Sequence, residues 1–146
     1  MVFVSFFVTF VIVGPARELQ ARVTMASPPH IALGALGESL ARTALEQRGY
    51  AIIATRYRTR AGEIDIVARD GGCLVFVEVK ARRHIDRGTP AEAVTPRKQR
   101  RIVAMARDFL ARYRSDATSC RFDVVAVLVA DGEPQVEVIR NAFDAS

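Results

Sequence analysis

The chain of 146 residues has only two cysteines and two histidines, and they form no metal-binding pattern. Cys73 and Cys120 make no CxxC pair, and His30 and His84 are isolated, which excludes a zinc set of ordinary spacing. The sequence also lacks a glycine-rich phosphate loop, a Ser/His/Asp set and an internal repeat. Each cysteine begins an apolar run, so we expect reduced thiols packed in the core of a cytoplasmic protein.

The sequence has no apolar run of the length that a membrane-spanning helix needs, which is about 20 residues. Met1–Val13 is almost wholly apolar but too short, and it lacks the basic start of a signal peptide. We expect residues 1–24 to be a mis-called extension, with translation beginning at Met25 and residues 25–146 forming one domain without membrane contact. The alternative is that the segment is an apolar tail or anchor. Mass spectrometry of the native N-terminus distinguishes them, because peptides covering Val2 to Arg17 would refute the mis-called start.

Positive charge is concentrated in one stretch of the chain. The net charge is +5, yet residues 81–114 alone hold ten Lys or Arg against three acidic residues. A second cluster, Arg56, Arg58 and Arg60, precedes the middle of the chain. Nucleic acid is the obvious polyanionic partner for such clusters. The alternative is a solvated basic face of a helix.

Hydrophobic periodicity and helix-end signals predict two helices. One spans Ile31–Arg48, with an apolar stripe and Gly49 as its stop. The other begins at Thr95-Pro96, with Thr95 as N-cap, and runs to about Tyr113. The expected buried positions are Leu33, Leu36, Leu40 and Ala44 in the first helix and Ile102, Ala106, Phe109, Leu110 and Tyr113 in the second.

Apolar runs bounded by turn signals predict five strands. They span Ala51–Arg58, two runs around Gly71-Gly72, Arg121–Ala130 and a weaker Gln135–Ile139, with a basic loop at Ala81–Thr89. The resulting order is α-β-β-β-α-β-β. We therefore expect an α/β fold in which a mixed β-sheet is flanked by helices.

Three ionisable residues interrupt the apolar runs beside Gly71-Gly72, where strands that only pack would carry Val or Ile. If these glycines are the central residues of a hairpin turn, Asp65 lies opposite Glu78, and Glu63 lies opposite Lys80. Glu78 and Lys80, two residues apart, share one face of their strand.

Two carboxylates at this separation repel each other unless a positive group lies between them. A hard divalent cation with oxygen ligands, Mg²⁺ or Mn²⁺, fits Asp65 and Glu78, and Lys80 could hold a water or a phosphate oxygen. The alternative is that Glu63, Asp65, Glu78 and Lys80 line a solvated face and form exposed salt bridges.

These features together resemble the core of the restriction-endonuclease-like, PD-(D/E)XK nuclease superfamily. More closely, the chain resembles the YraN-like family of small bacterial proteins, described as predicted endonucleases akin to archaeal Holliday-junction resolvases. The resemblance covers about residues 31–143. Its matching stretches are Gly34–Glu38, Gly49-Tyr50, Gly62–Ile66, Val75–Arg82, Lys98, Arg121–Val125 and Asn141–Phe143.

The resemblance implies a restriction-endonuclease-like fold and a catalytic set of Glu38, Asp65, Glu78 and Lys80. It implies that Asp65 and Glu78 bind a divalent metal with the Val79 carbonyl, and that Glu38 adds a ligand directly or through water. Lys80 would orient or deprotonate the attacking water. The sequence alone favours a solvent-facing helix glutamate at position 38, although its helical neighbours Gly34 and Ala41 are small enough to admit close approach of another element.

Several basic and supporting residues surround this set in the sequence. Candidates for phosphate contacts are Arg56, Arg58, Arg82, Lys98 and Arg101. Glu63 would hold Lys80 or be a second metal ligand. Arg121 and Asp123 would form either a structural pair or a pair at the edge of the site, and the apolar strand around Asp123 favours the structural role.

Three functions fit these residues. The first is a metal-dependent endonuclease acting on structured or branched DNA. The second is a nucleic-acid-binding protein on a nuclease scaffold that does not cut, although a binder has no need of paired carboxylates that repel phosphates. The third is a nuclease subunit that needs a partner or a homodimer, as two cuts in a symmetric junction would.

Overall fold

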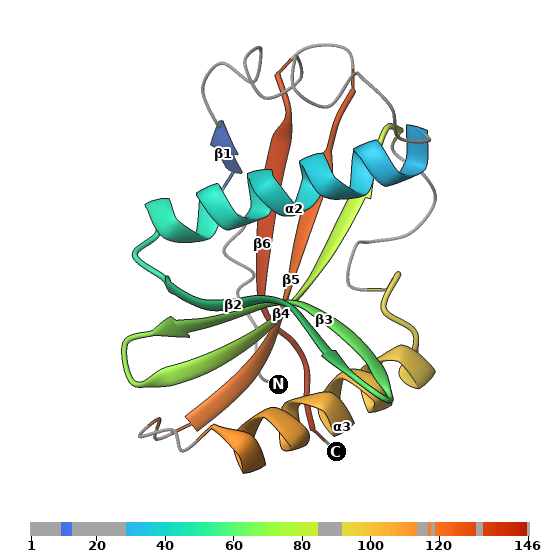
Figure 1. Cartoon of the computed structure of the whole chain (residues 1–146). Coiled ribbons are helices and arrows are strands. Elements are labelled where there is room, and N and C mark those ends of the chain that lie inside the picture. The colour runs from blue at the N-terminus through green and yellow to red at the C-terminus, as the bar shows by residue number, and fades with distance from the viewer. Residues whose placement is uncertain are drawn as a thin grey trace, which may run out of the picture.

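The computed structural model describes residues 10–12, 29–84, 92–113, 117, 119–130 and 133–145. From α2 onward the elements follow the expected order α-β-β-β-α-β-β (Figure 1). They are β1 (Phe10–Ile12), α2 (Pro29–Gln47), β2 (Ala51–Thr59), β3 (Gly62–Asp70), β4 (Cys73–Arg82), α3 (Pro96–Arg112), β5 (Ser119–Leu128) and β6 (Gln135–Phe143).

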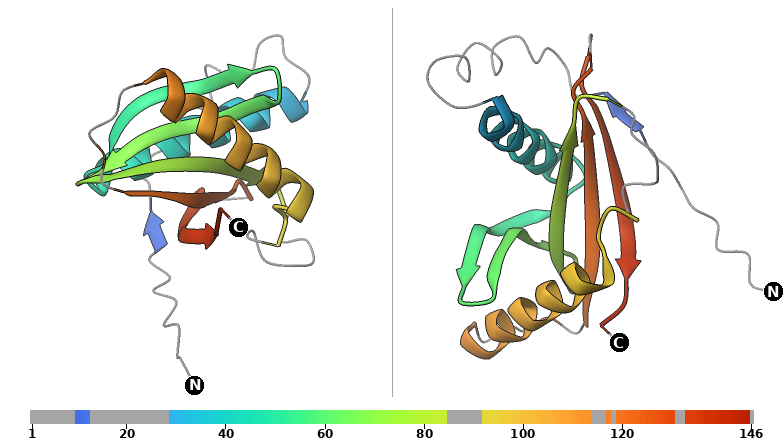
Figure 2. Two further views of the ribbon diagram at one scale, coloured as in Figure 1. Left: turned by 90° about the horizontal axis from the view of Figure 1, so that it is seen from below. Right: turned by 90° about the vertical axis from the view of Figure 1, so that its right-hand side faces the viewer.

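The strands form one mixed sheet in the order β1-β6-β5-β4-β3-β2. The central pair β4 and β5 is parallel and is connected through α3, and the other neighbours are antiparallel. The β2–β3 hairpin bends away from the plane of β4, β5 and β6 and lies between the two helices (Figure 2). The expected α/β fold with a mixed sheet and flanking helices is thereby confirmed.

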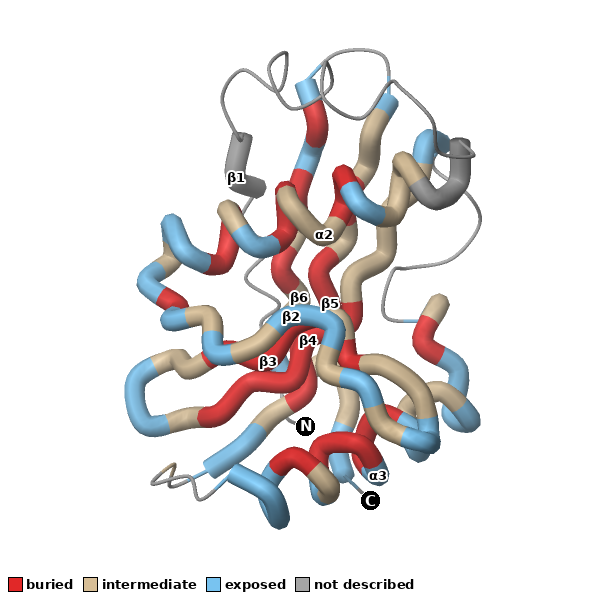
Figure 3. Tube along the Cα trace, in the orientation of Figure 1, coloured by how far each residue is buried: buried red, intermediate tan, exposed pale blue. Residues whose placement is uncertain are grey.

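Two apolar clusters hold the helices to the sheet. One joins α2 to the sheet through side chains such as Leu40, Ala44 and Val77. The other joins α3 to the sheet through Phe76, Phe109 and their neighbours. Buried positions accordingly run through the middle of β4 and β5 and along the inner side of each helix (Figure 3).

The ends of both helices follow the sequence signals. At the end of α2, Gly49 has φ +85°, and the Gly49 and Tyr50 amides donate to the Glu46 and Leu45 carbonyls. This paired pattern satisfies the last carbonyls of the helix. At the start of α3, the Thr95 hydroxyl accepts from the Lys98 amide, and Pro96 occupies the first turn.

Several expected details differ from the structure. Leu110 and Tyr113 are exposed, while Val103 and Met105 complete the buried face of α3. Tyr113 stacks on Phe109 at a ring separation of 4.3 Å, which leaves its outer face in solvent. Cys120 is exposed rather than packed in the core, although both cysteines are free thiols.

Three further points concern the ends of elements. β6 continues to Phe143, beyond the expected Ile139. β4 continues to Arg82 into the expected loop Ala81–Thr89, and residues 85–89 of that loop lie outside the described residues. β1 belongs to the segment 1–24 and pairs with β6; the rest of that segment is outside the described residues, and a start at Met25 stays a prediction. Neither described helix is long and apolar enough to cross a membrane.

Candidate metal and phosphodiester site

Asp65 lies where β3 and β4 separate. Their pairing runs from Asp70 opposite Cys73 to Ile66 opposite Val77, the register expected from the Gly71-Gly72 turn. At Asp65, the residue before Ile66, the contact between the two strands is made by a side chain. The Asp65 Oδ2 atom accepts a hydrogen bond from the Val79 amide at 2.7 Å. The Asp65 side chain is therefore held in place where the pairing of β3 and β4 ends.

Glu78 is the buried centre of the site. Its side chain is only 5% exposed, and its Oε1 receives two ammonium groups, from Lys80 at 2.9 Å and from Lys98 at 3.3 Å. Lys80 comes from the same face of β4, whereas Lys98 comes from the first turn of α3. The Glu78 Oε2 atom is buried and has no hydrogen-bond partner within the described part of the chain.

The two carboxylates influence each other. Burial raises the pKa of Asp65 to about 7, and the charge of Glu78 adds to the rise. The hydrogen bond from the Val79 amide opposes it, Glu38 adds a weaker rise, and Lys98 opposes it. A positive ion beside these groups would favour the ionised form of Asp65.

Glu38 reaches the same region from α2. This helix lies close to β4 at Gly37, where an added Cβ would overlap the Cβ of Ala81. Of the two small neighbours at which we expected close approach, Ala41 is fully buried, whereas nothing lies within 4 Å of a Cβ added at Gly34. The Glu38 carboxylate does not meet those of Asp65 and Glu78; the Arg56 guanidinium holds it at 2.7 Å and 3.3 Å.

The donor set suits a hard divalent cation. Among the described residues, no three Asp, Glu, His or Cys side chains converge into a ready-made metal cluster. Mg²⁺ does not need one, since it commonly binds through one or two carboxylates with waters and substrate phosphate. Asp65 and Glu78 offer such a pair, and an unpartnered buried oxygen on Glu78 costs free energy until a cation satisfies it. The residues present therefore fit the metal.

Three of the remaining candidates are Glu63, Arg101 and Arg82. Glu63 forms an ion pair with Arg58 at 2.7 Å. The expected Glu63–Lys80 contact is wrong, because β3 has left β4 at this point and pairs only with β2. Arg101 donates twice to the Ala61 carbonyl, which ties α3 to the β2–β3 turn. Arg82 lies at the end of β4, half-buried.

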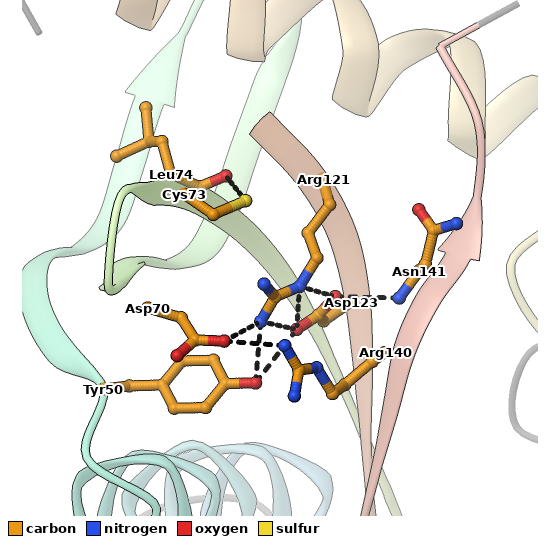
Figure 4. Close-up of polar contacts among 8 residues, drawn as sticks. All are labelled: Tyr50, Asp70, Cys73, Leu74, Arg121, Asp123, Arg140 and Asn141. Atoms are coloured by element: carbon orange, nitrogen blue, oxygen red, sulfur yellow. Dashed lines mark hydrogen bonds and ion pairs between the residues drawn. The ribbon is translucent and has the colours of Figure 1, made fainter. Parts of the chain in front are cut away.

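Arg121 and Asp123 belong to a separate buried network (Figure 4). Asp123 is 0% exposed and accepts from Arg121 and from the Asn141 amide. Arg121 also donates to Asp70 and to the Tyr50 hydroxyl. These bonds connect β5 to the start of β2 and the end of β3, in keeping with the structural role favoured for Asp123.

Sequence reasoning missed two features of the site. It treated Lys98 as a phosphate contact only and did not place it on Glu78, although the Thr95-Pro96 helix start puts Lys98 in the first turn. It also missed the backbone of Arg56, which has φ +52° inside a strand. No sequence signal marks that conformation, because glycine and asparagine are the residues that usually adopt it.

Known proteins resemble this chain over most of its length. A family model described as "Uncharacterised protein family UPF0102" matches residues 37–127. A UPF0102 protein of Symbiobacterium thermophilum is 52% identical over 114 residues, which cover 77% of this chain and 97% of the relative. The chain belongs to the UPF0102 family. A UPF0102 protein of Rhodococcus opacus is 49% identical over 115 residues, covering 78% of this chain and 98% of the relative.

Membership in UPF0102 confirms the expected relationship to YraN-like proteins. The matched range contains Glu38, Asp65, Glu78, Lys80 and Lys98. The family description names no activity, so the function of this UPF0102 protein has to be argued from its own site.

Proposed function

We propose that this UPF0102 protein is a metal-dependent endonuclease that hydrolyses phosphodiester bonds in structured or branched DNA. The single observation that carries the proposal is Glu78. A buried glutamate that faces two lysines, lies near a second carboxylate and has one oxygen without a partner among the described residues is costly for a merely structural strand. Such an arrangement is typical of a site that exchanges partners during a reaction.

Each residue has a distinct task in this proposal. Asp65 and Glu78 would hold Mg²⁺ or Mn²⁺ between β3 and β4, with the Val79 carbonyl beside them. A divalent cation at this position lowers the pKa of water and neutralises charge on the scissile phosphate. The Val79 amide fixes the Asp65 carboxylate at 2.7 Å, so this ligand is oriented before metal arrives.

The two lysines that face Glu78 would serve the phosphate and the water. Both ammonium groups lie within 3.3 Å of Glu78 Oε1, so a cation that takes this carboxylate would release them at the reaction centre. Lys80 would then orient the attacking water, and Lys98 would stabilise the charge that develops on the phosphate. The anchor of Arg101 on Ala61 keeps the first turns of α3, and so Lys98, against the hairpin.

Exposed cations suit a polyanionic substrate. Arg97, Arg100 and Arg107 lie exposed on α3, the helix that carries Lys98, and Arg83 lies exposed just after β4. Basic side chains of this kind position a nucleic-acid backbone without reading sequence. The preference for branched DNA comes from the resemblance to junction resolvases, which act as dimers on symmetric substrates, so we also propose a homodimer.

Cleavage of a substrate panel tests the proposal. Four-way junction, flap, single-stranded and duplex DNA and structured RNA are incubated with the protein in Mg²⁺, in Mn²⁺ and in EDTA. We expect metal-dependent cutting that Asp65→Asn and Glu78→Gln abolish and that Arg140→Met, a charge change in the other network, leaves intact. No cutting of any substrate, with salt-sensitive binding retained in EDTA, would contradict it and favour a non-catalytic binder.

A further inference from the structure

The backbone of Arg56 adopts a conformation that its side chain does not favour. Arg56 has φ +52°, in the left-handed region, although it lies inside β2 between Thr55, opposite Ile66, and Tyr57, opposite Ile64. A residue other than glycine pays about 1–3 kcal/mol for such a conformation. Thr55 and Arg56 are exposed in succession, so the alternation of β2 breaks here and the Arg56 side chain is re-aimed.

The contact that Arg56 makes does not offset this cost. Its guanidinium holds Glu38 at 2.7 Å and 3.3 Å, but the side chains are 48% and 26% exposed. Exposed ion pairs contribute about 0–1 kcal/mol to stability. The strain therefore exceeds the gain from this pair, and stability alone does not explain an arginine at this position.

The place of Arg56 in the molecule better explains why an arginine occupies this position. Arg56 lies between the Thr55–Ile66 and Tyr57–Ile64 pairs of β2 and β3, at the register position of Asp65. Glu38, and more weakly Glu63 and Asp65, raise the pKa of its guanidinium, so Asp65 is among the carboxylates near it. A planar guanidinium fork fits a carboxylate and a phosphate equally well. In the substrate-free protein the Glu38 carboxylate accepts both hydrogen bonds from the Arg56 guanidinium.

We propose that Arg56 is a phosphate-binding residue of the reaction centre, and that Glu38 holds its place until the metal and a backbone phosphodiester arrive together. Glu38 would turn from Arg56 toward a cation held by Asp65 and Glu78, which would free the guanidinium for the phosphate. Metal and nucleic acid then bind cooperatively, each raising the affinity for the other by the same factor. This inference rests on the proposed metal and phosphodiester site.

Binding measurements test the exchange without requiring cleavage. The affinity of a fluorescein-labelled four-way DNA junction is measured by anisotropy in EDTA and in excess Ca²⁺, and Mn²⁺ affinity is measured on the protein alone by calorimetry. For the unmodified protein we expect Ca²⁺ to tighten junction binding by about 5–150-fold, the usual range for coupled sites. Arg56→Gly should reduce this factor to less than about threefold.

The matched control is Arg42→Ala, which removes the same charge but breaks only the exposed pair with Glu46 on α2. It should keep the Ca²⁺ effect. Arg56→Gly should also bind Mn²⁺ alone at least as tightly as the unmodified protein, because it frees Glu38, whereas a folding defect would weaken Mn²⁺ binding. Glycine relieves the strain at this position, so the variant should keep its melting temperature.

The outcomes separate this inference from the endonuclease proposal. A full Ca²⁺ effect in Arg56→Gly would overturn the exchange, even if the unmodified protein cuts DNA. A Ca²⁺ effect that depends on Arg56 in a protein that cuts nothing would support the exchange and contradict the nuclease. Absence of Mn²⁺ binding by the unmodified protein would overturn both.

Discussion

At the scale of single residues, burial and a neighbouring carboxylate disfavour the charge of Asp65. Its pKa in the folded protein is about 7, raised first by burial and then by Glu78, against an ordinary value of 3.8. A carboxyl group with a raised pKa favours the folded state while it is protonated. Its contribution to stability is full below about pH 4 and is lost as the pH rises through about 7.

The variant Asp65→Asn should therefore be more stable than the unmodified protein in EDTA at pH 8 and nearly equal to it at pH 4. Asparagine keeps an oxygen for the Val79 amide and removes the charge, and the difference in free energy of unfolding should be on the order of 4 kcal/mol at pH 8. Urea unfolding at the two pH values measures it. An equal difference at both values, or a loss of stability at pH 8, would speak against the repulsion between Asp65 and Glu78.

Arg121, unlike Asp65, has a charge that stabilises the fold. Replacing it by methionine leaves the fully buried Asp123 without its charge partner, which should cost about 3–5 kcal/mol. The control Arg140→Met breaks a pair with Asp70 whose arginine is 63% exposed and should cost at most about 1 kcal/mol. Denaturant unfolding of the two variants measures both costs, and similar losses would rule out the structural role of the Arg121–Asp123 pair.

At the scale of elements, the close approach of α2 to β4 places Glu38 near the site. The variant Gly37→Ala should destabilise the protein by roughly 1–3 kcal/mol, since its Cβ would overlap Ala81 and force the helix outward. The matched change Gly34→Ala, in open space on the same helix, should stabilise it by about 0.5–1 kcal/mol. Thermal unfolding distinguishes them, and effects of the same sign would contradict this packing.

The elements also show what sequence could and could not predict. The two-glycine turn predicted the register of β3 and β4, which holds as far as Ile66 opposite Val77, one position short of the expected Asp65–Glu78 pair. The charge of Glu78 nevertheless raises the pKa of Asp65, so the two carboxylates lie near each other. The expected Glu63–Lys80 contact failed because β3 pairs with β4 only from Ile66 onward, and Glu63 forms an ion pair with Arg58 instead. The conformation of Arg56 is likewise a tertiary effect that no local signal marks.

At the scale of the whole molecule, the arrangement of the two helices and the sheet places the candidate site between β3 and β4. The hairpin of β2 and β3 lies between α2 and α3 (Figure 2). Asp65, Glu78 and Lys98 come from β3, β4 and α3, and Glu38 of α2 lies on Arg56 of the hairpin. The order of elements was predictable, because each helix and strand carried its own periodicity and end signals. The place where these elements come together depends on the bend of the β2–β3 hairpin away from β4. The sequence pattern does not predict that bend.

The most direct test of the site is calorimetric titration of Mn²⁺ into the unmodified protein and into Asp65→Asn at pH 7. Two buffers of different ionisation heat report the protons released. We expect one ion per chain with net proton release, because a carboxyl group of pKa about 7 must ionise to bind it, and no binding in Asp65→Asn. Equal binding by both proteins, or none by the unmodified protein, would contradict a metal site at Asp65 and Glu78.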